Sequence, residues 1–132
     1  MSVGVLVVTH EGVGEALMET AVGMLGFCPL AAAVLPVSRN CDPDLLDERA
    51  HALCERLDEG HGILVLTDIY GSTPANVACR LRRRGRVEVI AGVNLPMMVR
   101  VFNYATLTLP ELVEKALGGG REGIMVCVPP AP

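Results

Sequence analysis

Residues 3–10, Val-Gly-Val-Leu-Val-Val-Thr-His, decide the fold, because they form a short apolar run that ends in two polar residues. A run this short, rich in valine and closed by polar side chains, is typical of a strand buried inside a parallel sheet. Such a strand carries His10 to its carboxyl end. In open α/β sheets this edge is where ligands bind, so His10 is the first candidate for a functional residue.

Strand-like and helix-like segments alternate along the rest of the chain. Short apolar runs predict strands at residues 3–8, 30–37, 63–66 and 87–91, and a last short strand at residues 124–128. Helical spacing and capping residues predict helices at residues 12–25, 43–57, 97–104 and 110–117, and one from 74 into the arginine-rich segment 80–86. We expect the glycines at 118–120 to stop the last helix. The alternation predicts an α/β fold, a three-layer α/β/α open sheet with four parallel strands.

Composition narrows the class of protein. With 132 residues, of which 51% are hydrophobic and 3% aromatic, we expect a single domain spanning residues 1–132 with an aliphatic core. The net charge of −4 provides no general attraction for nucleic acid or anionic lipid. No signal peptide or membrane-spanning segment is visible in the sequence. The five cysteines are widely spaced without a CxxC motif, which favours reduced thiols in a cytoplasmic protein over a disulfide framework or a metal site.

Polar residues follow three of the predicted strands, and these residues define a candidate site. They are Thr9-His10, Thr67-Asp68, and Asn94 in the loop after the fourth strand. The carboxyl ends of parallel strands share one edge, so we expect Asp68 to orient the His10 ring while the other ring nitrogen acts as a nucleophile. The alternative is a structural histidine that hydrogen-bonds to a local carbonyl group.

Two predicted helix starts lie close to this edge. The helix that follows His10 should present free backbone N–H groups to an anion beside the ring. The helix that begins at Pro74, with Thr73 as its predicted N-cap after Gly71-Ser72, should do the same, with two hydroxyl groups in addition. Together with His10 and Asp68, these groups predict a phosphohistidine site that needs no metal or organic cofactor.

Three motifs in order resemble one known family. Thr9-His10 after the first strand, residues 68–76 (DIYGSTPAN) and residues 88–97 (EVIAGVNLPM) resemble the mannose-family EIIA domain of the bacterial phosphoenolpyruvate:sugar phosphotransferase system (PTS). The resemblance extends to about Gly123. It implies that His10 accepts a phosphoryl group from phospho-HPr and passes it to an EIIB domain. It also implies that Asp68 hydrogen-bonds the histidine, and that Thr73, which is usually serine in the family, contacts the phosphate.

The resemblance further implies a homodimer in which the last strand, antiparallel to the others, is exchanged between subunits. The chain departs from the family at the phosphate loop, which usually reads Gly-Gly-Ser-Pro. Here Ser72 stands in place of a glycine, which would strain the loop if that position needs a positive φ. Glu11 stands where the family often has glycine and adds negative charge near the phosphate.

These observations lead to a phosphotransferase component as the main hypothesis. We expect His10 and Asp68 to be catalytic, Gly71, Ser72 and Thr73 to bind phosphate, and Thr9 and Asn94 to complete the cleft. Because no EIIB domain follows within the sequence, a regulatory protein controlled by the phosphorylation of His10 remains an alternative. Two further alternatives are the phosphoryl donor of a dihydroxyacetone kinase and a small-molecule binding domain without phosphoryl chemistry.

Overall fold

A four-stranded parallel sheet forms the middle of the molecule in the computed structural model, which describes residues 2–28 and 30–130. Its strands lie in the order β2-β1-β3-β4. Their bounds are β1 (Gly4–His10), β2 (Ala32–Val37), β3 (Ile63–Thr67) and β4 (Val87–Ala91). The two inner strands, β1 and β3, are buried along their whole length except at His10. The predicted parallel sheet is therefore confirmed, and His10 is the exposed last residue of an otherwise buried strand.

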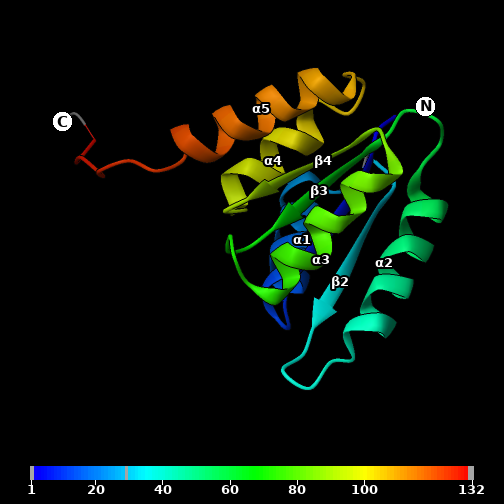
Figure 1. The fold of residues 1–132 in the computed structure, drawn as a ribbon. Helices are drawn as coiled ribbons and strands as arrows, with labels where there is room; N and C mark the ends of the chain where they lie inside the picture. Colours follow the sequence, from blue (N-terminus) through cyan, green and yellow to red (C-terminus); the bar gives the residue numbers. More distant parts are fainter. Residues whose placement is uncertain (1, 29, 131–132) are drawn as a thin grey trace.

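Helices cover both faces of the sheet (Figure 1). One face carries α1 (Val13–Leu25), α4 (Leu95–Asn103) and α5 (Leu109–Glu122), and the other carries α2 (Pro43–Leu57) and α3 (Thr73–Arg80), which continues into a short 3-10 turn, η1 (Leu81–Arg84). Successive side chains of a strand point to opposite faces. Val5 and Val7 accordingly join the core beneath α1, α4 and α5, whereas Leu6 and Val8 join the core beneath α2 and α3. The three-layer prediction is confirmed.

The glycines at 118–120 do not stop the last helix, so that prediction was wrong. Helix α5 continues through them to Glu122. The reason is close packing against α4: a Cβ atom on Gly119 would lie 2.6 Å from the Cβ atom of Arg100, and one on Gly120 would lie 2.8 Å from Cε of Met97. The glycines let the two helices approach each other, and this contact outweighs the low helix propensity of glycine.

The predicted strand at residues 124–128 does not form within this chain. In the described part, residues 124–130 have no regular secondary structure, and they extend away from the body of the molecule (Figure 1). Their apolar side chains are exposed, namely those of Ile124, Met125, Val126 and Val128. Strand β4 lies at the end of the sheet order, so one of its edges has no neighbouring strand within the described residues.

Candidate functional site

The site is built around a contact between the ends of two neighbouring strands. His10 is the last residue of β1, and Asp68 directly follows β3, which pairs with β1. One oxygen of the Asp68 carboxylate, Oδ2, accepts a hydrogen bond of 2.9 Å from the backbone N–H of His10 and lies 2.7 Å from its ring Nδ1. When Nδ1 carries the proton, the lone pair of the imidazole resides on Nε2. The expected meeting of His10 and Asp68 is therefore present.

The environment keeps the Asp68 carboxylate ionised. Burial of the carboxyl group favours its neutral form, but hydrogen bonds from the His10 backbone, the His10 ring and the Ile69 backbone outweigh burial and lower the Asp68 pKa from its ordinary value of 3.8. The Asp68 side chain is 15% exposed and that of His10 is 50% exposed. A sheltered negative charge thus orients a ring that remains open to reactants.

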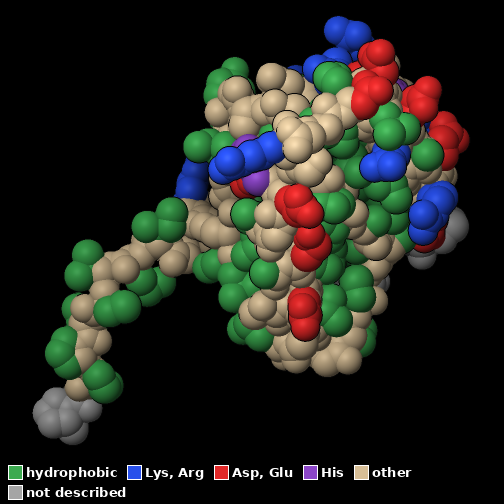
Figure 2. All heavy atoms as spheres, turned by 90° about the horizontal axis from the view of Figure 1, so that it is seen from below, with side chains coloured by type: hydrophobic (Ala, Val, Ile, Leu, Met, Phe, Trp, Pro, Cys, Tyr) green, Lys and Arg blue, Asp and Glu red, His purple; other side chains and the backbone are tan. Residues whose placement is uncertain are grey.

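A shallow cleft of about 210 Å³ adjoins the ring; we refer to it as the His10 cleft. It is lined by His10, Val37, Ser38, Arg39, Cys41, Thr73 and Pro74. Figure 2 shows the molecule from below the view of Figure 1, the side to which the arrowhead of β2 points. A histidine side chain is visible at this surface, next to a Lys or Arg side chain.

The lining residues from the loop after β2 were missed in the sequence. They are Ser38, Arg39 and Cys41, and none of them belongs to a recognisable motif. The pairing of β1 with β2 explains their position, because His10 lies beside Val37 in the register of the two strands. The contact between His10 and Asp68 was predicted because parallel strands end at the same edge of the sheet. The same rule, applied to β2 on the other side of β1, predicts that Arg39 lies near His10.

The loop before α3 places Thr73, but neither Gly71 nor Ser72, at the His10 cleft. The positive φ of this loop, 84°, falls on Gly71, while Ser72 has an extended conformation with φ −90°. Ser72 therefore causes no backbone strain. Its hydroxyl group donates a hydrogen bond of 2.7 Å to the carbonyl oxygen of Ile69. Ser72, rather than Thr73 as predicted, occupies the N-cap position, and Thr73 is the first residue of the helix.

Thr9 and Asn94 do not line the His10 cleft, contrary to expectation. Thr9 is fully buried, and its hydroxyl group donates to the His10 carbonyl oxygen and accepts from the N–H of Gly14, both at 2.8 Å. Asn94 caps α4, where its Oδ1 accepts from the N–H of Met97 at 2.9 Å. Both side chains hold secondary structure in place instead of facing a reactant.

The start of α1 is also less open to an anion than expected. The N–H of Gly12 donates to the Glu15 carboxylate at 3.1 and 3.2 Å, and the N–H of Gly14 donates to Thr9. These donors are therefore already used within the protein. The N–H groups of Val13 and Glu15 in the same turn have no backbone acceptor within residues 2–28 and 30–130, and the same holds for those of Thr73 and Ala75 at the start of α3. Of the two helix starts, that of α3 is the one that lines the His10 cleft, through Thr73 and Pro74.

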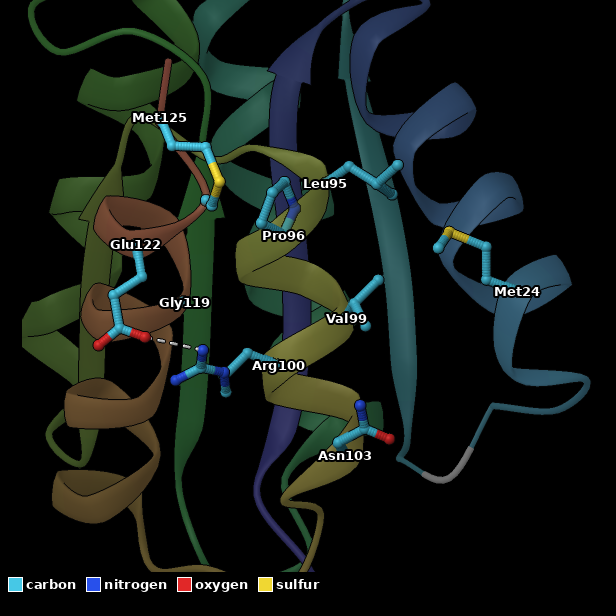
Figure 3. A pocket seen from close by; sticks show the side chains of 10 residues that line it. Met24, Leu95, Pro96, Val99, Arg100, Asn103, Gly119, Glu122 and Met125 are labelled. Atoms are coloured by element: carbon cyan, nitrogen blue, oxygen red, sulfur yellow. Dashed lines mark hydrogen bonds and ion pairs between the residues drawn. The ribbon is translucent and has the colours of Figure 1, made fainter. Parts of the chain in front are cut away.

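A second, apolar groove of about 500 Å³ lies apart from His10, between α1, α4, α5 and the start of the tail (Figure 3). Met24 and Met125 lie on opposite sides of it, and Arg100 pairs with Glu122 at 3.0 Å along one side.

In the part of the chain that the structure describes, no group of three or more His, Cys, Asp or Glu side chains is arranged to hold a metal ion. Across the same residues, no helix combines the length and apolar character of a transmembrane span.

The fold and site define a class of protein: an open, parallel α/β domain with a half-exposed histidine at the carboxyl edge of its sheet. Within this class, the sequence model described as "PTS system fructose IIA component" (EIIA-man) matches residues 4–117. The chain therefore belongs to the EIIA-man family, and the resemblance stated from the motifs is confirmed.

Curated relatives agree with this assignment. The chain is 32% identical to the mannose-specific EIIAB component of the Escherichia coli PTS over 136 aligned positions, which cover 94% of this chain and 39% of that protein. It is 32% identical over 84 positions to the fructose-specific EIIA component of Bacillus subtilis, covering 62% of this chain and 58% of that protein. The chain thus spans well under half of its E. coli relative.

The fold also matches a solved structure, the mannose/sorbose-specific IIA subunit from Enterococcus faecalis. The TM-score is 0.87 at 20% identity, with coverage of 100% of this chain and 99% of that one. At this identity the likeness concerns the fold, and it supports the arrangement of four parallel strands between two helical layers.

Proposed function

We propose that this protein is a phosphoryl carrier of the PTS, which accepts a phosphoryl group from phospho-HPr on His10 and passes it to an EIIB-type acceptor for sugar uptake in the cytoplasm. The observation that carries the proposal is the 2.7 Å contact between His10 Nδ1 and Asp68, which leaves Nε2 as the free nucleophile. Membership of the EIIA-man family supports it, as does the E. coli relative, which is a component of a mannose-specific PTS.

The proposed reaction is a direct transfer between two imidazole rings. The lone pair of His10 Nε2 forms a bond to phosphorus while the bond from phosphorus to the donor nitrogen breaks, and that electron pair returns to the donor ring. His10 keeps its proton on Nδ1, so the phosphorylated ring carries a positive charge that the Asp68 carboxylate stabilises. Positioning and electrostatics supply the acceleration, and the proposal includes no metal or organic cofactor.

The test is phosphorylation in a mixture of phosphoenolpyruvate, enzyme I and HPr. The wild-type chain should become labelled and His10→Ala should not. His51→Ala is the matched control, because His51 is exposed on α2 and outside the His10 cleft. Labelling of His10→Ala at the wild-type level would overturn the proposal.

The acceptor that discharges phospho-His10 distinguishes the roles open to a carrier. Transfer to an EIIB protein supports sugar uptake. Transfer to the subunits of a dihydroxyacetone kinase would make the chain the donor of that enzyme. If neither acceptor removes the phosphoryl group and the phosphorylated chain instead binds a target protein, its role is regulatory.

We also propose that the protein is a homodimer in which residues 124–128 add an antiparallel strand to β4 of the second copy. An edge strand with unpaired backbone groups readily pairs with another chain. The exposed apolar side chains of the tail would be covered by such an exchange. Light scattering should give a dimer for the full chain and a monomer for a chain ending at Gly123; two equal masses would contradict the exchange.

A further inference from the structure

Arg39 is a cation at the His10 cleft for which neither the fold nor the family motifs provide a role. It lies two residues beyond β2, in a turn, and lines the cleft together with His10 and Thr73. Its side chain is exposed and forms no ion pair with a carboxylate of the described residues. A guanidinium group in this position is available to a ligand of the cleft.

The other charged groups near the ring are negative, so they do not balance the negative charge of a transferred phosphoryl group. A phosphoryl group on Nε2 carries about two negative charges at neutral pH, close to the ionised Asp68 carboxylate. Glu11, the next residue in the chain, is exposed and also negatively charged, although it does not line the His10 cleft. Figure 2 shows several acidic side chains across the same face of the molecule.

The helix N-termini balance only part of the negative charge of the phosphoryl group. The N–H groups of Gly12 and Gly14 at the start of α1 are occupied by Glu15 and Thr9. At the start of α3, Pro74 has no N–H to offer. A helix N-terminus is equivalent to about half a positive charge. Among the residues that line the cleft, Arg39 is the one with a permanent positive charge.

We propose that the guanidinium group of Arg39 binds the phosphoryl group as it is transferred to His10. This inference rests on the proposed phosphoryl transfer. Arginine presents several N–H donors in a planar fork and can bond two phosphoryl oxygens at once. Such donors stabilise the negative charge on the equatorial oxygens while one P–N bond breaks and the other forms. Arg39 thereby acts as a catalytic residue that contacts the reacting group.

The test compares two phosphoryl donors on the wild-type chain and on Arg39→Ala, Arg39→Lys and Arg83→Ala. The first donor is phospho-HPr. The second is phosphoramidate, a small molecule that releases ammonia as its P–N bond breaks and needs no protein docking. Arg83 is the matched control because it is exposed, outside the His10 cleft and without an ion pair among the described residues.

We expect Arg39→Ala to slow the phosphorylation of His10 by about 10- to 100-fold with both donors, as for the loss of a hydrogen bond to a charged group. Arg39→Lys should fall between Arg39→Ala and the wild type, because lysine keeps the charge without the planar fork. Arg83→Ala should match the wild type. Phosphorylation is followed by mass spectrometry of the intact chain, and circular dichroism confirms that each variant is folded.

Three results would overturn the role of Arg39. The first is an equal rate of phosphorylation for Arg39→Ala and the wild type. The second is a slower rate with phospho-HPr alone, which would place Arg39 in protein docking. The third is an equally slow rate for Arg83→Ala, which would indicate a general charge effect. Failure of the proposed function is distinguishable: the wild type would then take no phosphoryl group from phospho-HPr, while the phosphoramidate arm would still compare Arg39→Ala with its controls.

Discussion

Asp68 holds His10 twice through a single oxygen atom, since Oδ2 lies 2.9 Å from the backbone nitrogen and 2.7 Å from ring Nδ1. The backbone contact fixes the end of β1 against the residue that follows β3. The ring contact selects the tautomer in which Nε2 is free. One carboxylate therefore links the geometry of the sheet edge to the chemistry of the ring, and changes at Asp68 should alter both.

Asp68→Asn should slow the phosphorylation of His10 without abolishing it. The amide oxygen can still accept hydrogen bonds from the backbone and the ring, but the negative charge that stabilises the phosphorylated ring is lost. We expect a decrease of about 10- to 100-fold in the rate of transfer from phospho-HPr. Single-turnover kinetics measure this rate, and a rate equal to that of the wild type would remove Asp68 from the mechanism.

The lowered pKa of Asp68 makes folding stability depend on pH in a defined direction. Because its pKa is below the ordinary value of 3.8 in the folded protein, the unfolded chain binds the proton first as the pH falls. The contribution of Asp68 is complete above pH 3.8 and is lost as the pH falls through the lower folded pKa. Urea unfolding of the wild type and of Asp68→Asn should give a stability difference that narrows in this range; a difference that widens on acidification would contradict the assignment.

Thr73 should contribute through its hydroxyl group, since it is the hydroxyl-bearing residue of the α3 start that lines the His10 cleft. Thr73→Val keeps the shape of the side chain but removes the donor, and we expect phosphorylation to slow by about 2- to 10-fold. Thr73→Ser keeps the hydroxyl group and should retain the wild-type rate within about twofold. Stopped-flow or quenched labelling measures both rates; equal losses in the two variants would show that packing, not the hydroxyl group, is responsible.

The strands and the pairing of His10 with Asp68 could be predicted from the sequence for one physical reason. A buried parallel strand is a short apolar run, and parallel strands present their carboxyl ends at a common edge. The order β2-β1-β3 then places residues that follow separate runs within hydrogen-bond distance. Local pattern and simple topology are sufficient for this part of the site.

The other side of the cleft depends on the strand order, which places β2 beside β1 and which a local sequence pattern does not contain. Arg39 lies in a turn without motif residues, and its place beside His10 follows from the β1–β2 register. Thr9 faces the interior because α1 lies above it, and the backbone nitrogen of Gly14 in α1 lies 2.8 Å from Thr9 Oγ1. The glycines of α5 predict a helix stop when the sequence is considered alone, because their packing partner, α4, is not visible in a local sequence window.

The glycines of α5 provide a test of that packing. A Cβ atom on Gly119 would lie 2.6 Å from Cβ of Arg100, close to the α4 backbone, where little relaxation is possible. On Gly118 the nearest atom is the end of the flexible Arg100 side chain, at 3.8 Å. Gly119→Ala should lower the free energy of unfolding by about 1–3 kcal/mol. Gly118→Ala, the matched control, should raise it by about 0.5–1 kcal/mol, because alanine is the better helix former.

Urea unfolding followed by circular dichroism measures both changes at one pH, and the sign of the difference between the two variants decides the question. If close approach of α4 and α5 is the reason for the glycine run, the same substitution must act in opposite directions at adjacent positions. Two stabilised variants would mean that the helices can move apart at little cost. Two equally destabilised variants would mean that both positions are packed and that Gly118 is not open to solvent.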